Sequence, residues 1–256
     1  MSAHVPRPPS LVAVCGRAVR AVIFDLDGVI TDTAVLHRRA WTAVFDEFLA
    51  RYDPTQQHFT EQDYLTYVDG KTRTDGTRSF LSARSISLDE SSTSDDRDTV
   101  AGLAERKDRM FRDLLAAEGP HPIAPSVGLI RRLRHGRIPV AVVSASRHAA
   151  EVLSAAGLAD AVDVRVDGLE AARLRLPGKP DPALFLEAAR RLGVAPTDAA
   201  VVEDAESGVQ AARHGGFGLV VGIAPPLRAT ALVRSGADVV VPGVDALDWE
   251  TCPNRE

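Results

Sequence analysis

The sequence predicts an α/β fold, in which a doubly wound, Rossmann-like parallel sheet carries a helical unit inserted after its first strand. Short apolar segments alternate with amphipathic helical patterns from about residue 120 onward. This alternation is typical of right-handed βαβ crossovers in a parallel sheet that helices cover on both faces. Residues 34–118 contain long helical patterns and no convincing strand. We therefore expect an α/β core at 19–33 and 119–256 and a helical domain at 34–118, and we interpret residues 1–18 as a loose N-terminal leader.

The first core strand is expected in "RAVIFDLD", where β-branched and aromatic residues run into Asp25 and Asp27. Four helical patterns then fill the insertion, at 34–52, 61–68, 74–85 and 98–119. The polar tract at 87–98 predicts an exposed loop that leads into a helix N-terminus.

Later segments complete the sheet. Further strands are expected at 137–144, 162–168, 198–204 and 217–223. Amphipathic helical patterns follow the first three of these strands, at 146–158, 181–193 and 206–216. The regular order of short strand and helix is what a sheet with helical crossovers requires.

The composition excludes several classes of function. Of the 256 residues, 45% are hydrophobic and 25% charged, and the formal net charge is −5. These values give no reason to expect nucleic acid or an anionic membrane as a partner, and no apolar run approaches the roughly 20 residues of a membrane span. Cys15 and Cys252 have no metal-ligand or redox-motif neighbours. We therefore expect a cytoplasmic, disulfide-free monomer that acts on a small molecule.

Polar side chains follow three of the predicted strands, at the point where each strand ends. Asp25 and Asp27 end the first strand, Ser144 follows a second, and the pair Glu203-Asp204 ends a third. In an open parallel sheet, ligands bind outside the carboxyl ends of the strands where the strand order reverses. Taken alone, "DLDG" is also typical of a turn and "VVED" of a helix N-cap. Their joint occurrence favours one polar site.

The acids of this predicted site favour a hard divalent cation. Asp25, Glu203 and Asp204 would repel one another if they converged, and a metal ion relieves that repulsion. A few carboxylate ligands with an open side suit Mg²⁺, which keeps waters and shares phosphate oxygens with a substrate.

The remaining groups indicate phosphoryl transfer. Lys179 and the Ser144 hydroxyl would supply a cation and a hydrogen-bond donor to a phosphoryl group. Asp25 would then act as nucleophile through an aspartyl-phosphate. Asp27, two residues further on, would act as general acid and base on the leaving or attacking oxygen.

These residues carry a resemblance to a known family. Asp25-x-Asp27-Gly28, Ser144, Lys179 and Glu203-Asp204 resemble, in order, the four motifs of the haloacid dehalogenase superfamily, across residues 20–245. The resemblance implies a core domain with a helical cap that closes over the site. The second aspartate is similar to that of the phosphotransferase branch. The resemblance also implies that Mg²⁺ is bound by Asp25, the Asp27 backbone carbonyl, Glu203 and Asp204.

Within the superfamily, the chain resembles the β-phosphoglucomutase-like subfamily. The similar segments are "FDLDGVITDTAVLHRRAW", "GKTRTD", "ERKD", "SASRH" and "GKPDPALF". The resemblance implies that the substrate is bound by Thr33, His37, Trp41, Gly70, Arg73, Lys107, Ala145, Ser146 and Arg147. Arg147 and His148 depart from the subfamily, which has a lysine and an asparagine there. Without the resemblance, a lone histidine such as His37 indicates a surface or core residue.

Two enzymatic functions stay open on the sequence alone. The first is a mutase that interconverts β-D-glucose 1-phosphate and glucose 6-phosphate through an enzyme-bound bisphosphate. The second is a phosphatase of small sugar phosphates, which would use the same nucleophile, base and metal. A catalytically silent scaffold is disfavoured, because the chain keeps both Asp25 and Asp27.

Overall fold

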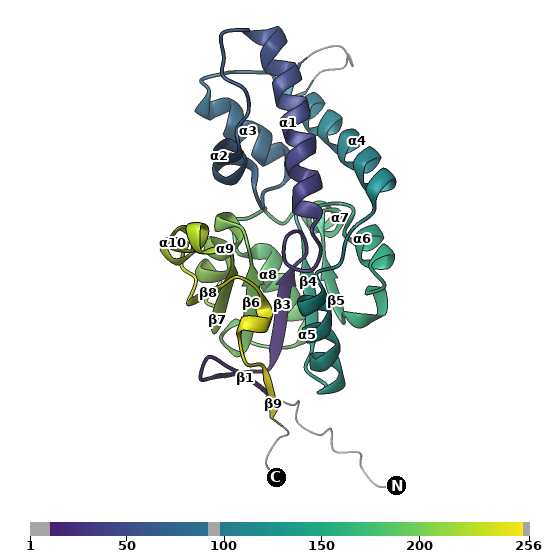
Figure 1. The fold of residues 1–256 in the computed structure, drawn as a ribbon, viewed down its shortest axis with the longest axis vertical. Helices are drawn as coiled ribbons and strands as arrows, with labels where there is room; N and C mark the ends of the chain where they lie inside the picture. Colours follow the sequence, from purple (N-terminus) through teal and green to yellow (C-terminus); the bar gives the residue numbers. More distant parts are fainter. Residues whose placement is uncertain (1–10, 92–97, 253–256) are drawn as a thin grey trace.

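A computed structural model describes residues 11–91 and 98–252, and in this part of the chain a six-stranded sheet forms the core (Figure 1). Its order is β5-β4-β3-β6-β7-β8, and all neighbouring strands are parallel. The strands are β3 (Ala21–Asp25), β4 (Val140–Val143), β5 (Val164–Val166), β6 (Ala199–Glu203), β7 (Leu219–Ile223) and β8 (Val239–Val241). The predicted doubly wound α/β fold is confirmed.

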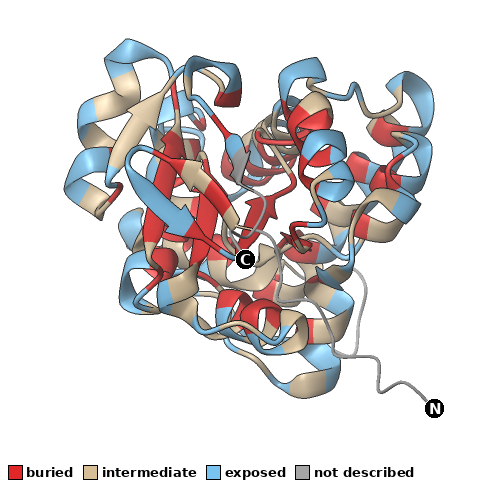
Figure 2. Ribbon diagram, turned by 90° about the horizontal axis from the view of Figure 1, so that it is seen from below, coloured by how far each residue is buried: buried red, intermediate tan, exposed pale blue. Residues whose placement is uncertain are grey.

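Helices cover both faces of this sheet. Along β3, Val22 and Phe24 join one buried cluster, while Ala21 and Ile23 join another on the opposite face. Figure 2 shows the buried strands between helices that are partly exposed. The helices are α5 (Ala124–His135), α6 (Ala149–Ala155), α7 (Gly168–Leu174), α8 (Ala183–Leu192), α9 (Glu206–His214) and α10 (Pro226–Ser235), with 3₁₀ turns η2 (Ala159–Ala161), η3 (Pro196–Asp198) and η4 (Val244–Ala246). Burial on both faces explains why inner strands such as β4 and β7 are apolar throughout rather than alternating.

A separate helical unit lies beyond the carboxyl ends of the strands (Figure 1). It comprises α1 (Thr33–Tyr52), α2 (Glu61–Asp63), a π-helical turn η1 (Tyr64–Val68), α3 (Arg73–Ala83) and α4 (Val100–Glu118). Its own core contains aromatic rings in tilted and edge-on contact, among them Phe45, Phe59 and Phe80. The loop predicted at 87–98 lies partly outside the described residues. At its end, the Thr99 hydroxyl caps α4 by accepting a hydrogen bond from the backbone N–H of Gly102 at 3.0 Å.

Two chain segments join the helical unit to the sheet, and they run against each other. The backbone N–H of Asp32 donates to the carbonyl of His121 at 3.0 Å, and that of Ile123 donates to Ile30 at 2.8 Å. The first segment leaves β3 and the second leads into α5. The unit therefore begins and ends at the same place.

The interpretation of residues 1–18 as a loose leader is wrong for residues 11–18. β1 (Leu11–Val14) and β2 (Arg17–Val19) form a hairpin, and β9 (Glu250–Cys252) pairs with β1 in the same antiparallel sheet. The two turn residues, Cys15 and Gly16, both have positive φ, which is typical of a tight hairpin turn. Val12, Val14 and Val19 are buried against the main core, and this burial stabilises the hairpin. The first ten residues lie outside the described part of the chain.

In the described part of the chain, no helix has the combination of length and apolar character needed to cross a membrane.

Candidate active site

The sheet order brings the polar strand ends together. Asp25 is the last residue of β3, Ser144 follows β4 and Glu203 is the last residue of β6. β4 and β6 flank β3 on its two sides. The edge that they share faces the helical unit (Figure 1), and it is where doubly wound sheets bind their ligands.

Lys179 lies in the loop before α8 and is almost fully buried between two of these acids. Its ammonium donates to Asp25 Oδ1 and, at 2.5 Å, to Glu203 Oε1. Burial opposes the charge on Lys179, but the two carboxylates outweigh it and raise the pKa of the lysine. Burial also raises the pKa of Asp25 well above its usual value; Lys179 opposes this effect, while Glu203 and Asp27 add to it.

Asp27 is held from both sides of the site. Thr33, the first residue of α1, donates its hydroxyl to Asp27 Oδ1 at 2.5 Å, and Ser144 donates to Oδ2 at 2.9 Å. His37 Nε2 lies 3.3 Å from Oδ1. Burial favours protonation of Asp27, but His37 and the two hydroxyls outweigh it and hold the pKa of the carboxyl below its usual value. These contacts therefore favour the ionised form of Asp27.

Asp204 lies against the backbone just after Asp27. Gly28 has a φ of +90°, and a Cβ at that position would stand 2.0 Å from Asp204 Oδ2. Only glycine allows this approach and this φ value. Burial raises the pKa of Asp204 well above its usual value, and repulsion from Asp69, Glu203 and Asp25 adds to this effect.

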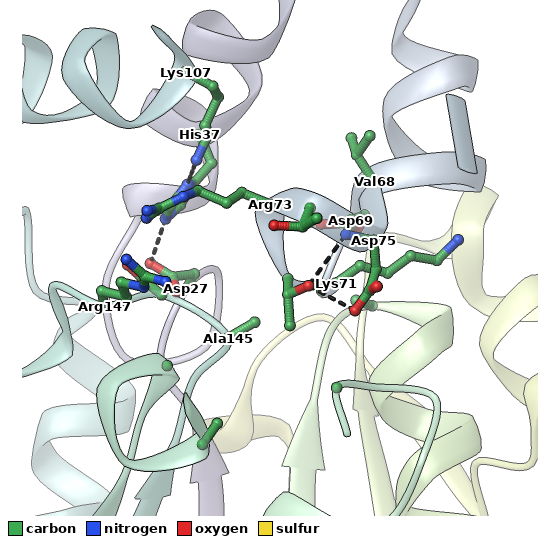
Figure 3. A pocket seen from close by; sticks show the side chains of 18 of the residues that line it. Asp27, His37, Val68, Asp69, Lys71, Arg73, Asp75, Lys107, Ala145 and Arg147 are labelled. Carbon is green, nitrogen blue, oxygen red and sulfur yellow. Dashed lines mark hydrogen bonds and ion pairs between the residues drawn. The ribbon is translucent and has the colours of Figure 1, made fainter. Parts of the chain in front are cut away.

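On the side of the helical unit, a buried lysine, Lys107, lies next to His37 (Figure 3). Lys107 Nζ contacts His37 Nδ1 and lies over the rings of Trp41 and Phe111, 5.3 Å and 4.9 Å from their centroids. The Phe111 ring stacks on His37 at 3.9 Å. Burial lowers the pKa of Lys107 to about 7. Burial also lowers the pKa of His37, and the positive charge of Lys107 adds to this effect.

Arg73, at the start of α3, is held by two acids of α4. Its Nη1 donates to Asp108 Oδ1 at 2.7 Å and its Nη2 to Glu105 Oε1 at 2.5 Å. The same Asp108 oxygen lies 3.1 Å from His148 Nε2, at the N-terminus of α6. Asp108 thus joins the helical unit to the sheet domain.

One cavity of about 320 Å³ connects these groups, a size typical of small-molecule sites. The sequence-predicted residues that line it are Asp25, Asp27, His37, Trp41, Gly70, Arg73, Lys107, Ala145, Ser146, Arg147 and Asp204. The other predicted residues are buried just behind the lining. Thr33 and Ser144 contact Asp27, Lys179 contacts Asp25, and Glu203 contacts Lys179.

Other lining residues were not among the site residues predicted from the sequence, and they include Asp69, Asp108 and His148. The Asp69 side chain is 9% exposed and lies 3.6 Å from Arg228 of α10. Burial raises the pKa of Asp69 to about 6. Position beside Gly70 and Lys107 was the signal that could have identified Asp69 and Asp108.

Among residues 11–91 and 98–252, no three His, Cys, Asp or Glu side chains are arranged as a group that holds a metal ion. Both carboxylate oxygens of Glu203 have partners within the protein. Its Oε1 accepts from Lys179, and its Oε2 accepts from the backbone N–H of Ala205 at 2.8 Å. The carboxylates of Asp25 and Asp204 both line the cavity.

Comparison with known proteins gives a consistent result. A family model described as haloacid dehalogenase-like hydrolase matches residues 19–216. A protein named beta-phosphoglucomutase from Mycobacterium bovis is 46% identical over 248 residues, which cover 93% of this chain and 95% of that protein. A fructose-1-phosphate phosphatase from Escherichia coli is 34% identical, with 78% of this chain and 94% of that protein covered.

A solved structure has the same fold. The crystal structure of a beta-phosphoglucomutase from Clostridium difficile superposes with a TM-score of 0.72 at 24% identity, covering 89% of this chain and 92% of that chain. The match to the family model spans most of the sheet domain and the helical unit. The chain therefore belongs to the haloacid dehalogenase-like hydrolase family.

Proposed function

We propose that the protein is a Mg²⁺-dependent β-phosphoglucomutase, which converts β-D-glucose 1-phosphate to glucose 6-phosphate through an aspartyl-phosphate. One observation carries the proposal. The cavity is lined by two acids of the sheet domain, Asp25 and Asp27, and by two basic side chains of the helical unit, Arg73 and Lys107. A substrate that carries phosphate at both ends, as the bisphosphate intermediate does, matches this arrangement. The name of the relative that is 46% identical supports it.

In the proposed cycle, a sugar hydroxyl attacks the phosphoryl group carried by Asp25, the bond between phosphorus and Asp25 breaks, and Asp27, ionised at rest, takes the proton of the hydroxyl. Asp25 then attacks the other phosphate of the bisphosphate, and Asp27 returns the proton to the sugar oxygen that leaves. Lys179 contacts Asp25 directly, so it offsets charge where the phosphoryl group is transferred. Thr33 and Ser144 hold the two carboxylate oxygens of Asp27 in place, so the proposed base is already oriented before the substrate binds.

The acids of the site fit a divalent cation. Asp25, Glu203 and Asp204 crowd together with Asp69, and this crowding is among the reasons that the pKa values of Asp25 and Asp204 are raised. A set of hard oxygen ligands with excess negative charge suits Mg²⁺. We propose that Asp25 and Asp204, with the Asp27 backbone carbonyl and Glu203, hold it. When bound, the ion would neutralise charge on the transferring phosphoryl group.

The second candidate is a phosphatase of small sugar phosphates. The similarity to a fructose-1-phosphate phosphatase favours it, and Asp25 and Asp27 would serve water as well as a sugar hydroxyl. The buried end of the cavity, where Lys107 is 5% exposed, favours the mutase. We propose that residues 34–118 act as the cap that excludes water, and that the protein works as a cytoplasmic monomer.

Phosphorus NMR tests the proposed function in a single sample. The purified protein is mixed with Mg²⁺, β-D-glucose 1-phosphate and a trace of the 1,6-bisphosphate. The mutase predicts conversion to glucose 6-phosphate without matching release of inorganic phosphate. If inorganic phosphate appears in place of glucose 6-phosphate, the phosphatase replaces the mutase.

Replacing Arg73 by alanine is expected to separate the two activities. Charge-assisted hydrogen bonds of an arginine contribute about 1.5–3 kcal/mol each, so we expect mutase turnover to fall about 10- to 100-fold. Hydrolysis of an aryl phosphate, which has no second phosphate, should fall far less. Arg78→Ala is the matched control, because Arg78 lies on the same helix but pairs with acids at the surface. Equal losses of both activities in the Arg73 variant would count against a second anion site there.

Replacing Lys107 by methionine is expected to stabilise the protein while it impairs catalysis. Because the pKa of Lys107 is about 7 when folded and about 10.4 when unfolded, the unfolded chain binds more protons between these values. Wild-type stability should therefore rise as pH increases from 7 to 10, and Lys107→Met should remove that rise. At pH 6 the variant should be more stable by roughly 1–3 kcal/mol. Urea unfolding at pH 6 and pH 9 measures both effects. Identical pH dependence in the two proteins would contradict the lowered pKa.

A further inference from the structure

The candidate phosphate-binding groups of the cavity already hold an anion that belongs to the protein. Asp108 Oδ1 accepts a hydrogen bond from Arg73 at 2.7 Å and lies 3.1 Å from His148 Nε2. Arg112 Nε is 3.7 Å from the other carboxylate oxygen. The Asp108 side chain is 17% exposed and lines the cavity. One carboxylate thus engages nitrogens of three basic side chains.

A phosphate seeks the same donors. Carboxylate and phosphate oxygens both form short, charge-assisted hydrogen bonds with guanidinium groups. Arg73 belongs to the helical unit and His148 to the sheet domain, and Asp108 lies between them. A phosphate that binds Arg73 must either displace Asp108 or bind next to its negative charge.

We propose that Asp108 acts as an internal competitor of the second phosphate, occupying the donors of Arg73 and His148 until a ligand phosphate replaces it. The proposal rests on the proposed function, in which Arg73 binds that phosphate. Asp108 is then a residue that sets affinity and contacts no reacting atom. Its expected effect is unusual in direction, since removing its charge should strengthen binding of a phosphate.

The competitor also gives specificity for charge. A neutral sugar hydroxyl cannot displace a carboxylate from a guanidinium, because it offers no compensating charge. A phosphate dianion can. Asp108 therefore disfavours ligands that lack a second phosphate, while it keeps Arg73 and His148 close together when the cavity holds none.

Titration calorimetry of the whole protein with inorganic phosphate tests the proposal. We expect Asp108→Asn to bind phosphate at least about threefold more tightly than the wild type, because a like charge close to the ligand is removed. Asp113→Asn is the matched control, since it removes the same charge from an exposed position on the same helix and should change the affinity less than twofold. Adding Arg73→Ala to Asp108→Asn should abolish the gain, which a merely structural role of Asp108 would not predict.

Equal or weaker phosphate binding by Asp108→Asn would overturn the proposal. A gain that persists without Arg73 would also overturn it. If the asparagine variant does not fold, Asp108→Ser provides a second neutral side chain for the same titration. Turnover of sugar phosphate, followed by phosphorus NMR in the wild type, reports on the proposed function separately. If the wild type does not convert the sugar phosphate but Asp108→Asn binds phosphate more tightly, the mutase proposal is refuted and the proposal that Asp108 competes with phosphate stands.

Discussion

Asp25→Asn is expected to abolish turnover without unfolding the protein. An amide cannot attack phosphorus as a carboxylate does, so activity should fall by about 10⁴-fold or more. Radiolabelled phosphoprotein, trapped by acid quench in the wild type, should be absent from the variant. The fold should be retained, because Lys179 keeps its ion pair with Glu203 when the Asp25 carboxylate becomes an amide.

Asp32→Asn is the control for this variant. Asp32 lies seven residues further along the same segment, and its side chain, 47% exposed, contacts His121 outside the site. It should retain wild-type turnover and phosphoprotein. If Asp25→Asn kept its phosphoprotein, another residue would be the nucleophile.

Lys179→Met is expected to damage both stability and activity. The ammonium is the ion-pair partner of Asp25 and Glu203, and removing one partner of a buried pair costs about 3–5 kcal/mol. The loss should be smaller at acidic pH. The two carboxylates left behind would have raised pKa values, so the folded variant would bind protons that the unfolded chain releases, and its stability would increase as pH falls. Urea unfolding at pH 5 and pH 8 measures the difference.

Lys71→Met separates this effect from the loss of any lysine near the cavity. Lys71 also lines the cavity, but it is half-buried and donates to the Ser79 hydroxyl at 3.0 Å. We expect its replacement to cost less than about 1 kcal/mol. Similar losses in the two variants would show that the buried ion pairs contribute little to stability.

The sheet domain could be predicted because its signal is local. Each strand is a short apolar run, and the polar residues at the strand ends follow from the chain order alone. β8 and β9 were not predicted. The three residues of β8 lie at the sheet edge and are only half-buried, and those of β9 are stabilised by pairing with β1, far away in the sequence. Long-range pairing of this kind leaves no periodicity in the sequence.

The sequence predicted which polar residues lie together at the strand ends, and it predicted their contacts with the helical unit less well. Asp25, Asp27 and Lys179 follow strands or precede a helix in recognisable motifs. By contrast, Asp108 gains its meaning from Arg73 and His148, which are 35 and 40 residues away in the chain. On α4 its charge resembles that of any exposed acid in "ERKDR". It is distinguished only by the packing of α4 against α3 and by its contact with His148 at the N-terminus of α6.

The chain enters the helical unit near Asp32 and leaves it near His121, and these two segments are hydrogen-bonded to each other. Because the backbone enters and leaves the helical unit at adjacent hydrogen-bonded positions, the unit is an insertion whose ends coincide. Replacing it by another segment with similarly spaced ends would leave the strand order, Asp25 and Lys179 where they are. One contiguous stretch of gene therefore encodes the whole helical unit, and its exchange would leave the residues proposed for phosphoryl transfer in the sheet domain unchanged.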